Sequence, residues 1–296
     1  MPEIPDITVY TERLTGLLAG HALRGVRLRS PFVLRTVDPP LTAAVGQEVK
    51  SAYRQGKRII LAVGEVCLVF HLMIAGRLRW RPAGAAPTRD TLVAFDFDHG
   101  TLLFGEASPK KRASLHVVLP ADVAAMDRGG HEVAADDWAG FQAALVRENR
   151  TLKRALTDPR LFSGIGNAYS DEILFAARLS PARLTTRLTD EEIEALHRAT
   201  VAVLAEFTAR IRAEVGAGFP EKVTAFREDM AVHGRFGQPC RHCAQPIQRI
   251  RYADNETNYC ARCQNADRLL ADRALSALLK KDWPRTLDEL EQLGRR

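Results

Sequence analysis

The start of the chain carries a helical pattern of hydrophobic and polar positions. Apolar side chains recur there with the spacing of one helical face, at Ile7, Tyr10, Leu14, Leu17 and Leu18. Asp6 can cap the start of this helix and Gly20 can end it. We therefore expect an amphipathic helix between these two residues, with its apolar face against a core.

From Leu23 to about Val118 the pattern changes to short runs typical of β-strands. Six runs stand out, at 58–63 (RIILAV), 65–73 (EVCLVFHLM), 77–82 (RLRWRP), 91–97 (TLVAFDF), 100–105 (GTLLFG) and 113–119 (ASLHVVL). Turn signals such as His99-Gly100 separate them. This part of the chain is predicted to form an antiparallel β domain, either a sandwich or a barrel.

Helical periodicity returns beyond 122–136, a stretch in which we expect a domain boundary. Helices are predicted at 136–146, 170–179 and 189–211, and Thr189 and Glu192 form a capping box at the start of the last one. One further helix is predicted at 266–281. The expected division is an N-terminal domain at 1–122, a linker at 123–136, a helical domain at 137–232, a cysteine module at 233–265 and a helical tail at 266–296.

Composition indicates a folded, mildly basic protein. Hydrophobic residues make up 46% of the 296 residues, and the net charge is +6. Positive side chains gather at 109–116, at 150–160 and around the cysteines. Such clusters suit a polyanion such as nucleic acid, although many proteins are mildly basic without any such partner.

The sequence also bears on membranes and export. Its start is acidic and lacks the basic and then apolar order of a signal peptide. The most apolar window, 59–76, is interrupted by Glu65 and His71, so it does not read as a membrane span. We expect a cytoplasmic, monomeric protein without a membrane partner.

Four of the five cysteines form two pairs with metal-ligand spacing. Cys240 and Cys243 are separated by two residues, as are Cys260 and Cys263, and sixteen residues lie between the pairs. Two such knuckles can surround one Zn²⁺ ion with four thiolates, which leaves no open position for water. Coincidental free thiols would not explain the spacing. We predict one structural zinc ion per chain and a core position for Cys67.

A glycine-rich stretch precedes the predicted helix at 170–179. Two glycines and Asn167 in GIGN could let the backbone approach an anion, with Asn167 as the helix N-cap. The same pattern also occurs in ordinary turns between helices. Lys153 and Arg154 in the preceding basic stretch favour a phosphate.

Together these stretches resemble one family, the formamidopyrimidine-DNA glycosylase and endonuclease VIII family of bifunctional base-excision repair enzymes. The shared motifs are MPE.P at the start, GKRIIL at 56–61, HL…G at 71–76, GIGNAYSDEILF at 164–175 and HGRFGQPC at 233–240. The resemblance covers about residues 1–265. It implies an α+β fold with an N-terminal antiparallel β-sandwich flanked by helices, a helix-two-turn-helix domain and a C-terminal β-hairpin zinc finger.

The resemblance also implies the chemistry. Pro2 would attack C1′ of a damaged nucleotide once Met1 is removed, and the resulting iminium would lead to strand cleavage by elimination. A terminal amine suits this role because its pKa lies near 8, about 2 pKa units below that of lysine. Glu3 matches the acid that assists sugar-ring opening, and Lys57 matches the lysine that contacts phosphate and assists β-elimination. Taken singly, the three also fit a common second residue, a helix charge and a solvated loop lysine.

Double-stranded damaged DNA is the implied partner, in the nucleoid if the cell is prokaryotic. Asn167 and the GIG amides are expected to hold phosphates, with Lys153 nearby. Ile74 lies where the family has the apolar wedge that fills the gap left by a flipped base. His71 would lie close to the cleft, although a buried strand histidine is an open alternative.

Two single residues depart from the family pattern. Asp6 replaces the usual glutamate and is one methylene shorter. Asn255 replaces the arginine, five residues before the third cysteine, that grips phosphates and assists δ-elimination in relatives. Arg249 or Arg251 could restore the phosphate contact but not the proton transfer.

Two loops depart as well. The loop at 105–116 keeps basic residues, among them Arg112, but offers no aromatic wedge. The segment 217–231 is shorter than the loop with which relatives clasp an oxidised guanine.

The sequence leaves two alternative functions: a glycosylase with AP lyase activity for which δ-elimination is in doubt, or a catalytically weak DNA-damage-binding protein. Pro2, Glu3 and Lys57 favour the enzyme.

Overall fold

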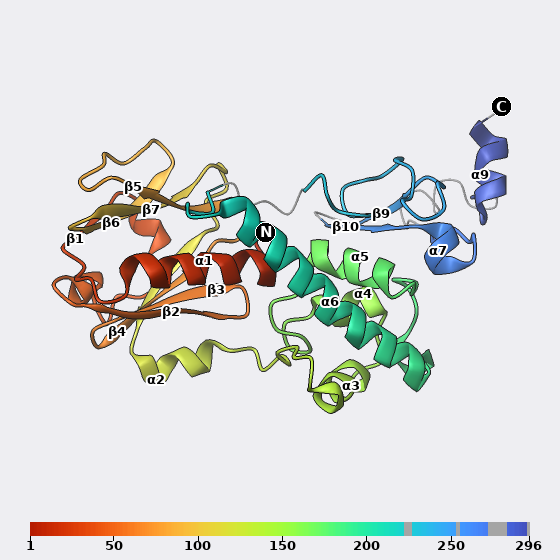
Figure 1. Cartoon of the computed structure of the whole chain (residues 1–296), viewed down its shortest axis with the longest axis horizontal. Coiled ribbons are helices and arrows are strands. Elements are labelled where there is room, and N and C mark those ends of the chain that lie inside the picture. The colour runs from red at the N-terminus through yellow and green to blue at the C-terminus, as the bar shows by residue number, and fades with distance from the viewer. Residues whose placement is uncertain (222–226, 253–254, 272–282, 295–296) are drawn as a thin grey trace. The chain divides into compact units, whose positions relative to one another are not determined.

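The computed structural model describes residues 1–221, 227–252, 255–271 and 283–294. The chain forms two compact units (Figure 1). Unit 1 comprises Met1–Arg128 and Ala205–Ala225, and unit 2 comprises Gly129–Leu204 and Phe226–Arg296. The finer division into five segments remains a prediction.

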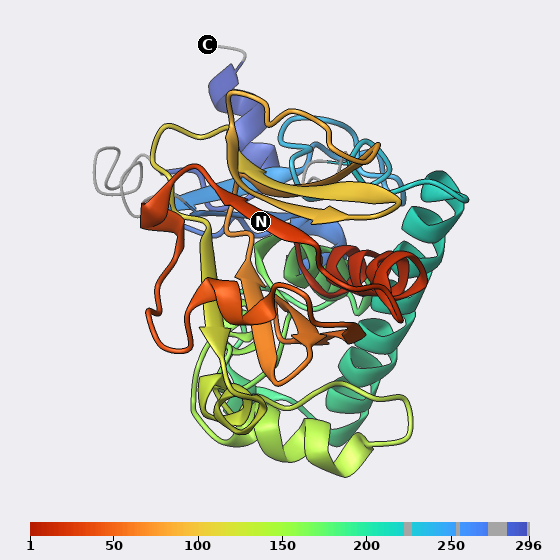
Figure 2. The ribbon, with the colours of Figure 1, turned by 90° about the vertical axis from the view of Figure 1, so that its left-hand side faces the viewer.

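Unit 1 contains two four-stranded antiparallel sheets. The first has the order β1 (Gly25–Leu28), β6 (Thr91–Phe97), β7 (Gly100–Glu106) and β5 (Gly76–Arg81). The second has the order β2 (Val49–Gln55), β3 (Arg58–Val63), β4 (Val66–His71) and β8 (Ser114–Val118). Figure 2 shows the two sheets as separate layers with α1 (Ile4–Leu18) beside them.

Strand alternation explains why the apolar runs are nearly continuous. Ile59, Leu61 and Val63 of β3 are buried in a core shared with side chains of both sheets. Ile60, on the opposite face, packs against Val123 at the end of α2 (Pro120–Val123). Because both faces of this sheet are covered, a strict alternation of apolar and polar residues is not required. Cys67 lies in the second of these clusters, as predicted.

The predicted N-terminal helix is confirmed, and its apolar face enters the core between the sheets. Its buried residues there are Ile7, Tyr10, Leu14 and Leu18. The helix starts earlier than predicted, because Glu3 is its N-cap and Asp6 already lies in the first turn. It ends at Leu18, and Gly20 follows with φ of 81°.

Unit 2 is helical, with a small hairpin. Its elements are α3 (Trp138–Val146), α4 (Leu152–Thr157), α5 (Asn167–Ala176), the first part of α6 (Asp190–Val215), β9 (Gln248–Tyr252), β10 (Asn255–Tyr259), α7 (Ala261–Asn265) and α9 (Leu287–Gly294). Short 3-10 turns occur in the two units at η1 (Pro31–Val33), η2 (Leu41–Ala44), η3 (Ala124–Met126) and η4 (Thr185–Arg187). The predicted capping box of α6 is confirmed: Thr189 N donates to Glu192 Oε2 at 3.0 Å and Glu192 N to Thr189 Oγ1 at 3.3 Å.

The tail packs next to the hairpin of β9 and β10. Leu287 of α9 is buried against Tyr259 and Ala261. Of the helix predicted at 266–281, residues 266–271 are not helical, and 272–281 lie outside the described residues. The α+β fold class is confirmed. In the described part of the chain, every helix is too short or too polar to cross a membrane.

Candidate active site and metal centre

The start of α1 holds two buried carboxylates. Glu3 and Asp6 are 2% and 1% exposed. Glu3 N donates to Asp6 Oδ2 at 2.9 Å, and the Glu3 side chain accepts from the backbone of Asp6. This reciprocal capping box fixes Glu3 next to the chain terminus. The shorter Asp6 side chain therefore has a structural role, because it accepts the hydrogen bond that closes the capping box.

Charged groups from several elements act on the terminal amine. Burial lowers the pKa of the amine of Met1 below its usual value of 8.0. The carboxylates of Glu3 and Asp6 oppose this shift, whereas Arg77 and Lys57 add to it. The structure thus brings Glu3 and Lys57 into electrostatic range of the chain terminus, where Pro2 is buried.

Lys57 lies in a two-residue turn between β2 and β3. The partners Gln55 and Arg58 close the turn, and Gly56 has φ of 57°. Hairpin turns of this length require a positive φ at their first central residue, which glycine adopts without strain. The half-buried Lys57 side chain is therefore carried by a rigid connection.

His71 and Ile74 belong to one tight turn. Ile74 is 56% exposed at its tip. The turn is closed by Gly76 N, which donates to Leu72 O at 2.8 Å, and a Cβ on Gly76 would lie 2.3 Å from that oxygen. His71 Nδ1 accepts from Met73 N at 3.3 Å. His71 is therefore a half-buried strand residue that supports the turn, and its place close to a DNA cleft stays a prediction.

His71 is neutral at ordinary pH. Burial, followed by the charges of Arg58 and Lys57, lowers its pKa from 6.5 to about 4. A neutral imidazole that accepts from Met73 at Nδ1 carries its proton on Nε2. Arg112, by contrast, is exposed on the loop between β7 and β8 and is not part of this group.

In unit 2 α5 begins within the GIGN stretch, three residues before the predicted range of 170–179, and the N-cap lies one residue before the predicted Asn167. Gly166, in an extended conformation, is the N-cap, and Asn167 is the first helical residue. Lys153 is 4% exposed. Its Nζ donates to Asn167 O at 2.6 Å, to Ser170 Oγ at 2.9 Å and to Asp171 Oδ1 at 2.6 Å.

The hairpin places its polar residues on two faces. Arg249 pairs with Asn258 and Arg251 with Glu256, so these four share one face, whereas Asn255 pairs with Tyr252 on the other. Arg249 lies over the ring of Phe236 at 4.4 Å and 3.6 Å from Glu256. Asn255 is exposed at the start of β10.

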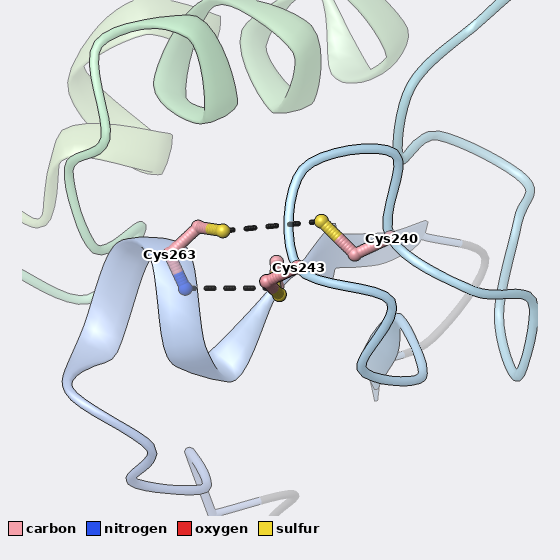
Figure 3. A group of neighbouring side chains, drawn as sticks. Cys240, Cys243 and Cys263 are labelled. Carbon is pink, nitrogen blue, oxygen red and sulfur yellow. Dashed lines mark hydrogen bonds between the residues drawn. The ribbon is translucent and has the colours of Figure 1, made fainter.

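The four paired cysteines converge. Their sulfurs all lie within 4.8 Å of one another. Figure 3 shows the sulfurs of Cys240 and Cys263 facing each other. These two sulfurs are 3.9 Å apart, and those of Cys243 and Cys260 are 3.4 Å apart. An ion about 2.3 Å from four tetrahedral sulfurs requires separations of about 3.8 Å. The donor set and spacing fit a structural Zn²⁺, as predicted.

Sequence reasoning missed the buried polar partners in unit 2. Asp171, Glu172, His233 and Asn258 are all at most 4% exposed. A signal for the two acids was present: they precede the apolar run 173–175 in a short helix that is buried on most sides. Buried carboxylates need donors, so partners were required.

Comparisons with known proteins match all three parts of the chain. Residues 1–108 match the formamidopyrimidine-DNA glycosylase N-terminal domain, 131–214 the H2TH domain of the same enzymes and 237–266 the zinc finger found in FPG and IleRS. A formamidopyrimidine-DNA glycosylase of Thermus thermophilus is 35% identical over 279 residues, which are 89% of this chain and 98% of the relative. The Exiguobacterium enzyme is 29% identical over 276 residues, with 89% and 99% covered.

A solved structure shares the fold. The Lactococcus lactis Fpg in complex with abasic-site-containing DNA superposes with a TM-score of 0.76 at 22% identity, covering 89% of this chain and 99% of that one. These findings define the class as DNA repair glycosylases with a zinc finger. The chain belongs to the formamidopyrimidine-DNA glycosylase family, whose enzymes are bifunctional glycosylases and lyases.

Proposed function

We propose that this chain removes oxidised bases from double-stranded DNA and cuts the strand at the resulting abasic site, with the nitrogen of Pro2 as nucleophile. The observation that carries the proposal is the group of charges around the chain terminus. Glu3 is fixed by the capping box, and Lys57 lies within electrostatic range of the terminal amine. The solved relatives of the same fold were captured with damaged DNA.

The reaction follows from a free secondary amine at the chain terminus. After Met1 is removed, the Pro2 nitrogen attacks C1′, the base leaves and an iminium forms. The cationic iminium acidifies the C2′ hydrogens, and loss of one proton expels the 3′ phosphate as the C3′–O bond breaks. A free terminal amine has a pKa near 8, so a useful fraction of the Pro2 nitrogen is unprotonated and nucleophilic near neutral pH.

Glu3 and Lys57 support two different steps. Glu3 protonates the sugar ring oxygen as the ring opens. Lys57, on the rigid hairpin turn, binds the phosphate that becomes the leaving group. Ile74, at the tip of the turn held by His71, fills the gap left by the flipped base.

We propose that cleavage stops at β-elimination. Asn255 cannot supply the positive charge of an arginine, and Arg249 and Arg251 lie on the other face of the hairpin. Arg249 and Arg251 of the hairpin, and Asn167 at the start of α5, would still bind phosphate, but the group that promotes a second elimination is missing. The enzyme would act as a cytoplasmic monomer at the nucleoid.

Borohydride trapping on a duplex with one abasic site tests the proposal. The native chain, shown by intact mass to lack Met1, should form a covalent adduct. A matched variant with one extra serine before Pro2 should form far less adduct, because its proline nitrogen is an amide and its free amine is displaced by one residue. Tight binding of the native chain without an adduct would instead identify a damage-binding protein.

A further inference from the structure

Lys153 and Asp171 form a buried ion pair in unit 2. The side chains are 5% and 0% exposed, and Nζ lies 2.6 Å from Oδ1. An ammonium group has three donors, and here all three have partners: Asp171, the carbonyl of Asn167 and the hydroxyl of Ser170. A phosphate could bind Lys153 only by displacing one of them.

The groups that Lys153 holds belong to the first turn of α5. Ser170 N and Oγ both donate to Gly166 O, at 3.1 and 2.5 Å. Two of the hydrogen bonds that Lys153 donates, to Asn167 O and to Ser170 Oγ, therefore hold the GIGN turn in place. The positive charge of Lys153 is therefore used within the protein, whereas the GIGN turn is the part that would contact a phosphate.

The second oxygen of Asp171 is used by the zinc-finger region. Asp171 Oδ2 lies 2.8 Å from His233 Nδ1 and accepts from Asn258 N at 3.1 Å and Asn258 Nδ2 at 3.2 Å. Asn258 lies in β10, two residues before Cys260. One carboxylate thus joins the GIGN turn, through Lys153, to the strand that leads into the metal centre.

We propose that Lys153 and Asp171 are positioning residues, which hold the GIGN turn and the zinc-finger hairpin in one fixed arrangement for binding the DNA backbone. This inference rests on the proposed DNA-binding function. It assigns Lys153 to support of Asn167 and gives the contact with phosphate to Asn167 and the turn amides.

The salt dependence of binding distinguishes support from contact. Each phosphate neutralised by a cationic side chain contributes about 0.9 to the slope of log K against log salt concentration on B-DNA. The probe is a duplex that carries a stable tetrahydrofuran abasic analogue. Because Lys153→Met alone leaves Asp171 buried without its cation, the informative variant is Lys153→Met with Asp171→Asn, which removes both charges.

The double variant should bind about tenfold more weakly at fixed salt with an unchanged slope. Lys57→Gln, which removes the proposed phosphate lysine of unit 1, serves as the control and should lower the slope by about 0.9. Zinc content is measured for each protein. A slope that falls by about 0.9 in the double variant would make Lys153 a phosphate contact, and unchanged affinity would remove its positioning role. Borohydride trapping of the native chain tests the proposed function independently.

Discussion

The two units use their lysines in opposite ways. Lys57 in unit 1 is half-buried on a hairpin turn and acts electrostatically on the chain terminus. Lys153 in unit 2 is 4% exposed, and its ammonium group donates all three of its hydrogen bonds to protein groups. Burial and donor saturation, more than residue type, decide whether a cation acts on a ligand or on its own scaffold.

The carboxylates differ in the same way. Glu3 is held by a backbone capping box at the end of one helix. Asp171 is held by donors from α4, β10 and the segment that carries His233. Unit 1 thus fixes its acid locally, whereas unit 2 depends on contacts between distant parts of the sequence and on the metal centre.

The largest effect is expected from removal of zinc. Structural zinc sites contribute about 10–16 kcal/mol of apparent binding free energy in small zinc-finger peptides. Chelation should unfold the hairpin, release Asp171 from Asn258 and abolish DNA binding, while unit 1 keeps its fold. Hydrogen exchange should show lost protection in β10 with α1 and β3 unchanged; equal loss in both units would contradict this division.

The next largest effect separates the two carboxylates of the capping box. Glu3→Gln should lower base excision by about 100-fold or more, because a general acid contributes about 10²–10⁴-fold. Asp6→Asn is the matched control, since its amide oxygen can still accept from Glu3 N, and should lower the rate only a few-fold. Single-turnover kinetics on a duplex with one oxidised base measure both. Equal losses would mean that Glu3 is needed only for the cap.

His71 should make unit 1 sensitive to acid. Its pKa falls from 6.5 to about 4 on folding, so between these values the unfolded state binds more protons than the folded state. Stability is therefore full above about pH 6.5 and declines as the pH falls toward 4, by up to about 3 kcal/mol. Urea unfolding at pH 7 and 4.5 should show this loss, and His71→Asn, which keeps an acceptor for Met73 N, should lack it.

The smallest effect concerns the turn that carries Ile74. Met73 has φ of 51°, a left-handed conformation that costs a residue with a Cβ about 1–2 kcal/mol. Met73→Gly should therefore stabilise unit 1 by about 1 kcal/mol, measured by urea unfolding. Met73→Ala, which keeps the Cβ, is the control and should give no such gain. A loss of stability in the glycine variant would mean that the Met73 side chain contributes more than the strain costs.

Periodicity and spacing predicted the parts of the molecule that depend on local sequence. The face of α1, the runs of β3, β6 and β7, the capping box of α6 and the cysteine pairs all follow from patterns within a few residues. Strand β2 was missed because VKSAYRQ is half-buried and has no clear alternation. Its position depends on pairing with β3, which its own residues do not reveal.

The sequence predicted which residues belong to the site better than it predicted which residues contact one another. Glu3 and Lys57 were named from motifs, but the partnership of Glu3 with Asp6 depends on a helix start that sequence placed too late. The burial of Lys153 depends on Asp171, and that of Asp171 on Asn258. The partners of these buried charges come from distant segments that pack together, so no periodic pattern in the sequence reveals them.

The position of the covalent bond is the most direct test of the central claim. Protein trapped with borohydride on abasic DNA is digested, and the peptide that carries the deoxyribose remnant is sequenced by mass spectrometry. The remnant should lie on the nitrogen of Pro2, in a peptide without Met1. A remnant on Lys57 or any other lysine, or trapped protein that still begins with methionine, would contradict the account.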